Sequence, residues 1–428
     1  MKPEIEFKNS AEIRAFQEKE LRKSLDHVAE HSAYYQRVFM AHGIDPSSIR
    51  SLEDLRKIPL TSKEDLQNQN KDFLCVQQEE IIDYVRTSGT LGEPVTLALS
   101  DKDLDRLAYN EAISFACARI GKKDVLQLMT TIDRQFMAGL AYFLGARKLG
   151  AGIIRVGSAN PEMHWDSIMK LKPTFLIAVP SFLLKMIQYA KEMNIDLGAT
   201  SVRAALCIGE PIREESLGMN PLAERIKQGW DIELFSTYAS TEMSTAFTEC
   251  EQHQGGHHHP ELVIVEILDE AGNEVNEGEV GELVITHLGV EAMPLIRFKT
   301  GDMVQAHHAP CSCGRNTLRL GPIIGRKGQM IKFRGTTLYP PALSNVLNRF
   351  VELDSFVIVL SKDELGLDVI SLKMNSSSQD EALILSIKDH FRAKLRVVPG
   401  IEFLDAETMK SLRFPKGSRK PILLIDER

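Results

Sequence analysis

The sequence predicts an α/β fold with two domains: a large N-terminal domain with helix-covered sheets plus a β subdomain, and a small C-terminal α+β domain. Between residues 124 and 238, apolar segments of strand length alternate with helix-like segments, the pattern of a parallel sheet covered by helices. After residue 260 the chain changes to strands joined by turns, and after residue 328 helices and strands mix again. A chain of 428 residues is long enough for two or three such domains.

The N-terminal region predicts a helical segment with a defined start and end. Asn9 and Glu12 have the spacing of a helix capping box, and apolar residues then recur over 21–28 at the spacing of one helix face. Gly43 and the turn at 45–48 end this region.

The alternating region supplies the central sheet. Its expected strands are 124–129, 152–156, 174–179, 202–208 and 231–236. Helices expected between them include 135–148, 181–193 and 213–227. Because strands and helices alternate, we expect neighbouring strands to run parallel.

The last third of the chain predicts antiparallel strands and then a smaller unit. Segments 263–268 and 281–286 are expected to form antiparallel strands, with a turn at 269–273. The smaller unit has expected helices at 341–350 and 379–394 and expected strands at 355–361, 367–374 and 399–404. We therefore place the domains at 1–327 and 328–428, the second of about 100 residues and large enough to fold by itself.

Composition narrows the class of protein. Hydrophobic residues at 43%, charged residues at 26% and a net charge of −8 are ordinary for a globular protein and argue against a nucleic-acid partner. No apolar run reaches transmembrane length, and the first residues lack a secretory pattern, so we expect no membrane partner and a cytoplasmic enzyme. Six cysteines do not form a disulfide framework, and we expect Cys75, Cys117 and Cys207 to be buried thiols.

The segment Thr87-Ser-Gly-Thr-Leu-Gly-Glu-Pro94 is the most informative loop in the chain. Its glycines permit close approach of the backbone to a ligand, and its hydroxyl and N–H groups suit phosphate oxygens. No Gly-Lys-Ser/Thr follows, so it is not a Walker loop. By itself the loop is equally consistent with a hairpin turn rich in Ser, Thr and Gly.

Further segments accompany this loop in a fixed order. They are Cys207-Ile-Gly-Glu-Pro-Ile212, Ser236-Thr-Tyr-Ala-Ser-Thr-Glu242, Arg297-Phe-Lys-Thr-Gly-Asp302, Gly325-Arg326 with Ile331-Lys-Phe-Arg-Gly335, and Pro415-Lys-Gly-Ser-Arg-Lys420. In this order and spacing, the chain resembles the adenylate-forming ligase (acyl-CoA synthetase) superfamily and, within it, the phenylacetate–CoA ligase family. The resemblance extends over nearly the whole length, including 51–66 and 293–297.

The resemblance implies a two-step reaction. A carboxylic acid attacks the α-phosphate of ATP to give acyl-AMP and pyrophosphate, and the thiol of coenzyme A then attacks the acyl carbon. Two anions must meet in line and charge develops on the α-phosphoryl oxygens, so catalysis consists of positioning and electrostatic stabilisation. The resemblance also implies a mobile C-terminal lid domain and a homodimer.

The resemblance assigns roles to individual residues. Ser88, Gly89 and Thr90 would surround the β- and γ-phosphates, Glu242 would hold Mg²⁺, and Thr241 would hydrogen-bond the α-phosphate. The nucleotide-binding set is completed by Gly209, Glu210, Pro211, Ser236, Thr237, Tyr238, Asp302 and Arg326. Among these, Gly209–Pro211 and Tyr238 would line the adenine pocket, Asp302 would bind the ribose hydroxyls, and Arg326 would lie near ribose and phosphate.

Lys420 is the expected lysine of adenylation, because the closing Ile425-Asp-Glu-Arg428 aligns it; Lys416 is the alternative. The chain also departs from the family pattern. Leu91 and Glu93 stand where Thr and Lys are usual, and Ala239 stands where Gly is usual. Gly325-Arg-Lys-Gly-Gln329 lacks the two usual hinge carboxylates, and Arg419 replaces the usual Gly before Lys420. Gly328 is the expected hinge position. These departures keep open a catalytically silent nucleotide-binding homologue.

A second motif predicts a metal site. Cys250, His257, Cys311 and Cys313 provide three thiolates and an imidazole, a tetrahedral zinc set that leaves no open position and therefore indicates structural zinc. His253, His258 and His259 are rival ligands. The phenylacetate–CoA ligase family often has such a pattern, with the His after two glycines, as in Gly255-Gly256-His257.

The acyl substrate is less well defined than the reaction. The family builds its acyl pocket partly from the segment 130–139, where phenylacetate-active relatives usually have a Tyr-Gly-rich stretch and this chain has Asp133-Arg134. Either the pocket is reshaped or these charges face solvent; from the resemblance we expect an aryl or arylacetic acid, such as phenylacetate. A second enzyme hypothesis is transfer of the acyl group to a carrier-protein thiol or an amine.

Overall fold

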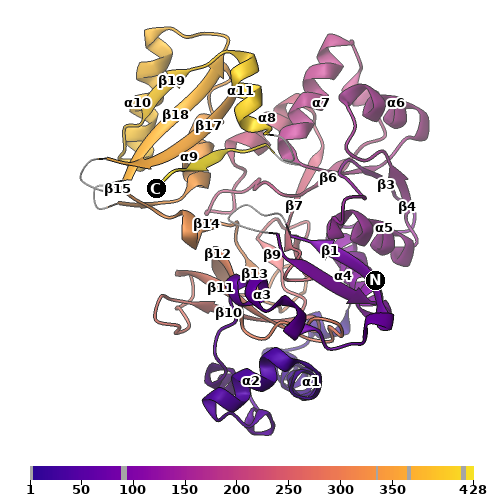
Figure 1. Cartoon of the computed structure of the whole chain (residues 1–428). Helices are drawn as coiled ribbons and strands as arrows, with labels where there is room; N and C mark the ends of the chain where they lie inside the picture. The colour runs from indigo at the N-terminus through magenta and orange to yellow at the C-terminus, as the bar shows by residue number, and fades with distance from the viewer. Residues whose placement is uncertain (1–2, 88–93, 334–335, 364–367, 416–420) are drawn as a thin grey trace. The chain divides into compact units, whose positions relative to one another are not determined.

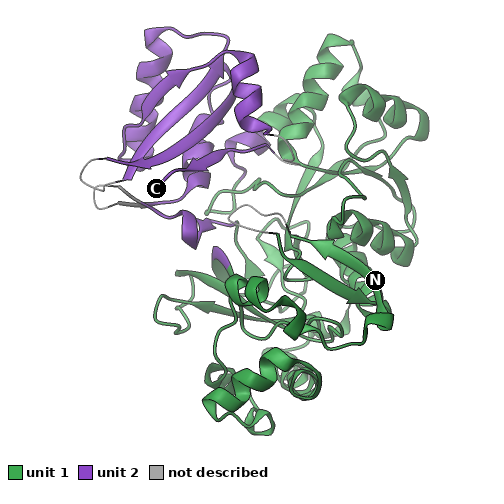
Figure 2. Cartoon of the chain, viewed as in Figure 1, with its two compact units in different colours: residues 1–218, 225–300, 304–322 green, residues 219–224, 301–303, 323–428 purple. Residues whose placement is uncertain are grey.

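A computed structural model describes residues 3–87, 94–333, 336–363, 368–415 and 421–428 (Figure 1). The chain divides into two compact units (Figure 2). Unit 1 contains residues 1–218, 225–300 and 304–322, and unit 2 contains 219–224, 301–303 and 323–428. The domain boundary expected after residue 327 stays a prediction.

The helices are α1 (Ser10–His31), α2 (Ala33–His42), α3 (Lys63–Asn68), α4 (Asp101–Cys117), α5 (Met137–Leu149), α6 (Pro161–Leu171), α7 (Pro180–Glu192), α8 (Pro221–Gly229), α9 (Pro340–Leu347), α10 (Glu381–Leu395) and α11 (Ala406–Arg413). The strands of unit 1 include β1 (Ile81–Arg86), β2 (Thr96–Ser100), β3 (Val125–Leu128), β4 (Gly152–Arg155), β5 (Phe175–Ala178), β6 (Ala204–Cys207), β7 (Glu233–Ser240), β8 (Thr245–Glu249), β9 (Gly256–His257), β10 (Val263–Leu268), β11 (Val280–His287), β12 (Phe298–His307) and β13 (Arg319–Leu320). The remaining strands are β14 (Gly325–Arg326), β15 (Ile331–Phe333), β16 (Thr336–Leu338), β17 (Leu353–Lys362), β18 (Asp368–Ser376), β19 (Gly400–Phe403) and β20 (Leu424–Asp426).

The parallel sheet expected between residues 124 and 238 is confirmed. Its strands lie in the order β4-β3-β5-β6-β7, and every neighbouring pair is parallel. β5 and β6 are buried at every position, as strands covered on both faces must be. Side chains of this sheet, α4 and α5 form one apolar core, with Phe115, Phe175 and Phe235 fully buried.

The chain reverses direction after β7, and the rest of the sheet in unit 1 is antiparallel. β8 and β9 follow β7 as antiparallel neighbours, and β10 pairs with β11 over 263–268 and 282–287. The expected antiparallel strands at 263–268 and 281–286 are therefore confirmed. The expected turn at 269–273 is closed by the Asp269 carboxylate, which accepts hydrogen bonds from the N–H groups of Ala271 and Asn273.

The helical N-terminus begins and ends as the sequence predicts. The Asn9 side chain caps α1 and Glu12 completes the capping box. Gly43, with φ of 62°, ends α2 in the left-handed conformation that glycine adopts without steric cost. The helix expected at 213–227 was placed too early: it begins at Pro221, where the Asn220 side chain caps it by accepting a hydrogen bond from the N–H of Ala223.

Unit 2 has the α+β organisation expected beyond residue 328. Its four-stranded sheet has the order β19-β18-β17-β20, and α9 and α10 pack their apolar faces into one core with it. α11 and β20 have no counterpart among the elements predicted from the sequence. β20 pairs parallel to β17 over residues 424–426, so the last strand closes one edge of this sheet.

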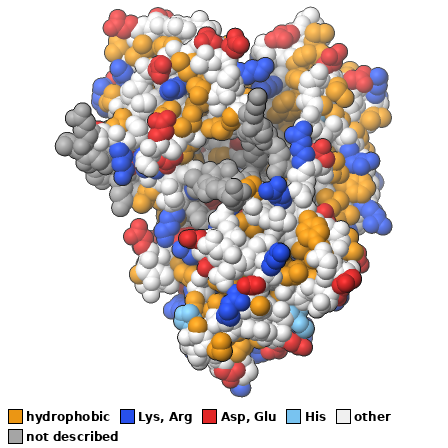
Figure 3. Space-filling model, viewed as in Figure 1, with side chains coloured by type: hydrophobic (Ala, Val, Ile, Leu, Met, Phe, Trp, Pro, Cys, Tyr) orange, Lys and Arg blue, Asp and Glu red, His pale blue; other side chains and the backbone are white. Residues whose placement is uncertain are grey.

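The hydropathy of the helices and the distribution of charge on the surface can be compared with the composition of the chain. In the part of the chain that the structure describes, no helix combines the length and apolar character that crossing a bilayer requires. On the face drawn in Figure 3, acidic and basic side chains are interspersed on both units.

One buried carboxyl makes stability depend on pH. Glu111 of α4 is 5% exposed and accepts a hydrogen bond from the Asn110 amide at 3.1 Å. Burial raises the pKa of Glu111 to about 8. Because the pKa is raised, the folded protein keeps a proton that the unfolded chain releases, and stability falls as the pH rises from about 4.5 to about 8.

We therefore expect Glu111→Gln, which mimics the protonated acid, to stabilise the protein at pH 8 by on the order of 3 kcal/mol and to change it little at pH 5. Urea unfolding of both proteins at the two pH values measures this difference. An equal difference at pH 5 and pH 8 would show that Glu111 does not carry the effect.

Candidate active site and metal centre

The ends of β6 and β7 bring two of the quoted motifs together. The strands are parallel neighbours, with Cys207 opposite Ser236, so the residues that follow β6 leave the sheet beside Ser236, while β7 continues to Ser240. Gly209-Glu210-Pro211 follows β6, and Gly209 has φ of 74°, which only glycine adopts freely. In α/β sheets, ligands bind beyond the carboxyl ends of the strands. This edge is therefore the candidate nucleotide site.

Glu210 is fixed in place by α7. Its carboxylate accepts hydrogen bonds from the N–H and the hydroxyl of Ser181, both at 2.8 Å, in the first turn of that helix. A carboxylate at a helix N-terminus is stabilised by the free N–H groups and the helix dipole. The side chain of Glu210 thus joins the segment after β6 to the start of α7. These hydrogen bonds give Glu210 a structural role that requires no bound nucleotide.

The end of β7 is held from the neighbouring strand β8. The Thr237 and Thr248 hydroxyls are 2.7 Å apart, and the Tyr238 ring stacks on Phe247 with centroids 6.0 Å apart. The N–H of Ser236 donates to the Glu249 carboxylate at 3.0 Å, and that carboxylate is paired with buried Arg213 at 2.9 Å. Ser236, Thr237 and Tyr238 are half-buried, so this surface is both ordered and accessible.

Thr241 and Glu242 lie in the turn between β7 and β8. The Glu242 carboxylate is largely shielded, with 12% of the side chain exposed, and pairs with Lys63 of α3 at 3.2 Å. A carboxylate that attracts a cation is the kind of ligand that Mg²⁺ uses together with nucleotide phosphates. The residue type therefore fits the expected magnesium role of Glu242, which stays a prediction.

The phosphate-loop residues Ser88, Gly89 and Thr90, together with Leu91 and Glu93, lie outside the described residues. The structure describes how the loop is flanked. β1 and β2 are antiparallel, and Thr87 and Val95 exchange hydrogen bonds: Thr87 N–H donates to the Val95 carbonyl at 2.9 Å, and Val95 N–H donates to the Thr87 hydroxyl at 3.0 Å. The flanking strands β1 and β2 therefore form a hairpin. This arrangement is compatible with both interpretations of the segment between them, a turn or a phosphate loop.

The expected ribose-binding pair lies within unit 2, to which residues 301–303 in the middle of β12 belong. Asp302 is 5% exposed and pairs with Arg326 at 3.2 Å, on strands β12 and β14, which are antiparallel there. Lys327–Gln329 forms one 3₁₀ turn that contains Gly328, the expected hinge. Lys420 and Lys416 lie outside the described residues.

Cys250, His257, Cys311 and Cys313 form a compact cluster whose ligand atoms all lie within 4.8 Å of one another. The Sγ atoms of Cys250 and Cys311 are 3.7 Å apart, and His257 Nε2 lies 3.4 Å from Cys250 Sγ and 3.6 Å from Cys313 Sγ. Tetrahedral zinc bonds of about 2.3 Å to sulfur and about 2.05 Å to nitrogen place two sulfurs about 3.8 Å apart and sulfur about 3.6 Å from nitrogen. The cluster therefore matches the dimensions of a tetrahedral zinc site.

The other three histidines of this segment have other contacts. His253 lies between Glu249 and Glu233, His258 is bonded to the Val263 carbonyl at 2.6 Å, and His259 is bonded to Glu6 at 2.5 Å. Burial lowers the pKa of His257 to about 3, which leaves the imidazole neutral, and Thr317 lies 3.3 Å from its Nδ1. A neutral imidazole whose second nitrogen is hydrogen-bonded is the usual metal-binding state of histidine.

A buried ion-pair network joins the N-terminus to this cluster. Glu6 is fully buried and accepts from Arg315 Nε at 2.6 Å, and Arg315 lies 3.5 Å from Cys313 Sγ through its Nη1. Burial alone would raise the pKa of Cys313, but hydrogen bonds from the main chain and side chain of Arg315 bring it below its ordinary value. Arg315 thus favours the thiolate form that metal binding requires.

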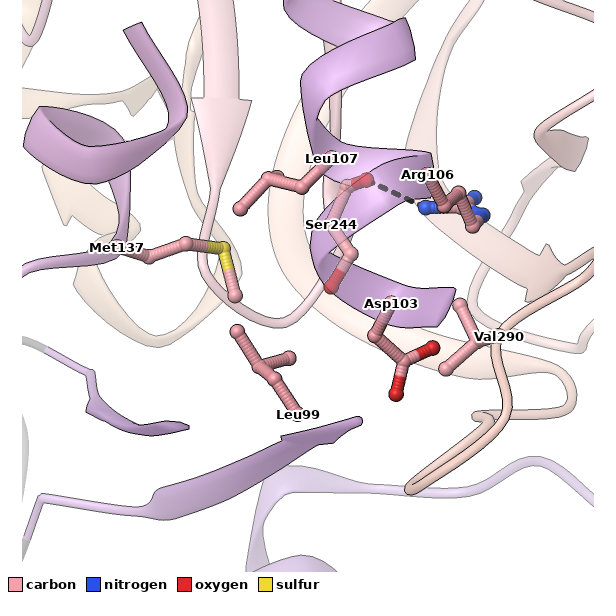
Figure 4. A pocket seen from close by; sticks show the side chains of 7 residues that line it. All are labelled: Leu99, Asp103, Arg106, Leu107, Met137, Ser244 and Val290. Carbon is pink, nitrogen blue, oxygen red and sulfur yellow. Dashed lines mark hydrogen bonds between the residues drawn. The ribbon is translucent and has the colours of Figure 1, made fainter. Parts of the chain in front are cut away.

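The segment 130–139 resolves one alternative from the sequence. The Asp133 and Arg134 side chains are 70% and 69% exposed, so these charges face solvent rather than a pocket. A cavity beside this region, between β2, α4 and the turn after β7, has a volume of about 10 Å³. It is lined by Leu99, Asp103, Arg106, Leu107, Met137, Ser244 and Val290 (Figure 4). This is the size of one water molecule, so the cavity cannot hold a carboxylic acid.

Comparison with known proteins identifies the class to which this fold and site belong. The model of the AMP-binding enzyme family matches residues 19–292, and the chain belongs to that family. The matched range contains the flanks of the phosphate loop, the ends of β6 and β7, and Glu242.

The relatives are more specific than the family model. The chain is 29% identical to phenylacetate-coenzyme A ligase of Thermus thermophilus, covering 88% of this chain and 84% of that protein. It is 28% identical to phenylacetate-coenzyme A ligase of Aromatoleum evansii, covering 97% and 95%. Among solved structures, 2-hydroxyisobutyryl-CoA ligase in its postadenylation state has a TM-score of 0.86 at 23% identity, covering 100% of this chain and 92% of that one. At that identity the structural likeness shows the shared fold.

Several residues of the site were not singled out from the sequence. Lys63 lies within the segment 51–66, which was noted only for its resemblance to the family. In the sequence, Lys63 is separated from its partner Glu242 by the whole parallel-sheet region. Glu6 and Arg315 lie at opposite ends of unit 1 in the sequence. No local pattern signals such pairs; an unusually buried glutamate near the N-terminus becomes visible only after folding.

Proposed function

We propose that this protein is an AMP-forming acid–CoA ligase of the phenylacetate–CoA ligase type. The observation that supports it best is that β6 ends at Cys207 beside Ser236 of β7, so that the motif 207–212 follows one strand next to the motif 236–242, in a chain of the AMP-binding enzyme family. The relatives with which it aligns over most of its length are phenylacetate-coenzyme A ligases. These relatives favour an aryl or arylacetic acid as substrate.

In the first half-reaction, a carboxylate oxygen attacks the α-phosphorus of ATP. The bond from that phosphorus to the α,β-bridging oxygen breaks, and pyrophosphate leaves with the electron pair. Thr241 and the hydroxyl loop Ser88–Thr90 would donate hydrogen bonds to phosphate oxygens, Tyr238 and Gly209–Pro211 would hold the adenine, and Asp302 and Arg326 would bind the ribose side of the nucleotide. Mg²⁺ held by Glu242 would neutralise phosphate charge.

In the second half-reaction, the sulfur of coenzyme A attacks the acyl carbon. The carbon–oxygen bond to AMP breaks, AMP leaves with the electron pair, and the thiol proton passes to solvent. The C-terminal domain, 328–428, would act as a mobile lid. It would present Lys420 to the active site in the first step and a CoA-binding surface in the second. A homodimer in the cytoplasm is the expectation that accompanies this assignment.

We propose that Cys250, His257, Cys311 and Cys313 bind a structural zinc ion. Four protein ligands at tetrahedral spacing leave no position for water or substrate, so the ion would hold the segments around 250–257 and 311–313 together rather than take part in acyl transfer.

The direct test of the function measures acid-dependent pyrophosphate release over a panel of phenylacetate, benzoate, a hydroxy acid and a medium-chain fatty acid, with and without coenzyme A. Pyrophosphate release with thioester formation is the expected result, with phenylacetate or benzoate among the best substrates. Release without thioester would favour transfer to a carrier protein or an amine. No release with any acid would favour the catalytically silent homologue suggested by Leu91, Glu93 and the missing hinge carboxylates.

A further inference from the structure

Polar side chains of α4 and β11 form hydrogen bonds with the main chain of the turn that carries Thr241 and Glu242 and of the residues directly after it. The turn spans residues 241–244, and Ser244 adopts φ of 48°, a left-handed conformation that a non-glycine residue keeps only when its surroundings impose it. Met243 is fully buried and Ser244 is 9% exposed, so the second half of the turn is anchored, and 12% of the Glu242 side chain is exposed directly before it. The supporting side chains are Arg106 and Asn110 of α4 and His287 of β11.

Arg106 joins three separate segments at one point. Its guanidinium donates to the carbonyl oxygens of Ser244 at 2.7 Å, Leu262 at 2.6 Å and Leu288 at 2.9 Å. Figure 4 shows the guanidinium directed at the Ser244 carbonyl beside the water-sized cavity. Three carbonyls at three directions match the planar fork of arginine, which a lysine ammonium on a flexible stem cannot reproduce. Arg106 therefore determines where Ser244 lies relative to β10 and β11.

His287 fixes the neighbouring peptide unit. The N–H of Leu295 donates to His287 Nδ1 at 3.1 Å, so Nδ1 must be the unprotonated nitrogen of the neutral ring. Nε2 then carries the hydrogen and donates to the Met243 carbonyl at 2.9 Å. Burial lowers the pKa of His287 to about 3, with the charge of Arg106 as a further cause and hydrogen bonds to the main chain of Met243 and Glu242 opposing it. The imidazole therefore stays neutral, with one fixed tautomer.

Asn110 completes the support on the far side of the turn. Its side-chain oxygen accepts from the Thr245 hydroxyl and from the Ala246 N–H, both at 3.1 Å. Residues 243 to 246 are consequently held in succession by His287, Arg106 and Asn110. An acidic residue directly before such a rigid segment has little freedom to move.

We propose that Arg106 and His287 are positioning residues for adenylation: by holding the carbonyls of Ser244 and Met243, they set the position of Thr241 and Glu242 beside the nucleotide. This inference rests on the proposed function, because it concerns the same site. Neither side chain touches the nucleotide in this scheme. Residues that orient a metal ligand from behind commonly change metal affinity by about 10- to 100-fold when they are replaced.

The test uses Arg106→Lys, which keeps the charge and loses the fork, and His287→Phe, which keeps a buried ring and loses both hydrogen bonds. We expect each to raise the Mg²⁺ concentration for half-maximal pyrophosphate release by about tenfold, with the KM for coenzyme A unchanged. Electron paramagnetic resonance titration of Mn²⁺ into the complex with a non-hydrolysable ATP analogue should show the same weakening, and it requires no turnover.

Two comparisons separate positioning from simple destabilisation. His164→Phe removes another buried histidine, which is bonded to Gln127 on β3, and should lower thermal stability without changing the Mg²⁺ or Mn²⁺ dependence. In a Glu242→Gln background, adding Arg106→Lys or His287→Phe should produce no further weakening of Mn²⁺ binding, because the effect passes through Glu242.

Variants that lose stability but bind Mn²⁺ and ATP analogue as the native protein does would overturn the proposal. Fully additive losses in the Glu242→Gln background would overturn it as well. Failure of the proposed function has a different signature: the native protein would release no pyrophosphate with any acid, while the Mn²⁺ titration would still report whether Arg106 and His287 position Glu242.

Discussion

Replacing Lys420 by alanine is expected to abolish adenylation while the protein remains folded. Negative charge concentrates on the α-phosphate and the incoming carboxylate in the transition state, and an ammonium at that point lowers the barrier directly. Loss of one such electrostatic contact typically slows the chemical step by about 10²- to 10³-fold. The assay is acid-dependent pyrophosphate release, with circular dichroism and thermal unfolding to confirm the fold.

The chain end that follows Lys420 is anchored on unit 2. Arg428 bonds to Asp368 at 2.8 Å, to Asp426 at 2.7 Å and to the Met330 carbonyl at 2.8 Å, so the residues after Lys420 are fixed on unit 2. The choice of Lys420 over Lys416 stays a prediction from the sequence, which the following comparison tests.

Lys416→Ala is the matched control for Lys420→Ala. It removes the same charge four residues earlier and should retain most of the activity. The Lys420→Ala protein should still convert supplied acyl-AMP and coenzyme A to thioester, because pyrophosphate does not leave in that step. Loss of activity in Lys416→Ala with normal release by Lys420→Ala would transfer the role to Lys416.

Removal of the metal from the Cys/His cluster is expected to destabilise unit 1 strongly. Free energy of metal binding becomes free energy of folding, and the expected loss is on the order of 5 kcal/mol for a buried four-ligand zinc site. Elemental analysis should find one zinc per chain, and a strong chelator should lower the unfolding midpoint of the native protein. Cys250→Ser should reproduce that loss without the chelator.

Three variants test the ligand assignment. His257→Ala should release the metal, whereas His253→Ala should retain it, because His253 contacts Glu249 and Glu233 instead of the thiols. Cys207→Ser removes a buried thiol outside the cluster and should keep the zinc content at one per chain. Full zinc content in Cys250→Ser or His257→Ala would contradict the assignment.

Much of the fold followed from local patterns. The capping box at Asn9, the glycine at the end of α2 and the alternation of strands and helices depend on residues close together in the sequence, and these were confirmed. Boundaries were less accurate: α8 begins at Pro221, because the residues before it lack the apolar periodicity of the helix and Pro is favoured in the first turn. α11 and β20 were missed, since short elements at the end of a chain derive their stability from packing.

The sequence by itself determined the parallel sheet with its antiparallel continuation, the order of the nucleotide-site motifs, and three candidate zinc cysteines with four candidate histidines, because each is a pattern of residue types. Tertiary structure alone decided that His257 rather than its three neighbours meets the cysteines, that Lys63 pairs with Glu242, and that Arg106 and His287 support the turn behind it. These contacts join segments far apart in the chain, and hydrogen bonds and ion pairs between such segments form only when the packing of the core brings them within about 3 Å.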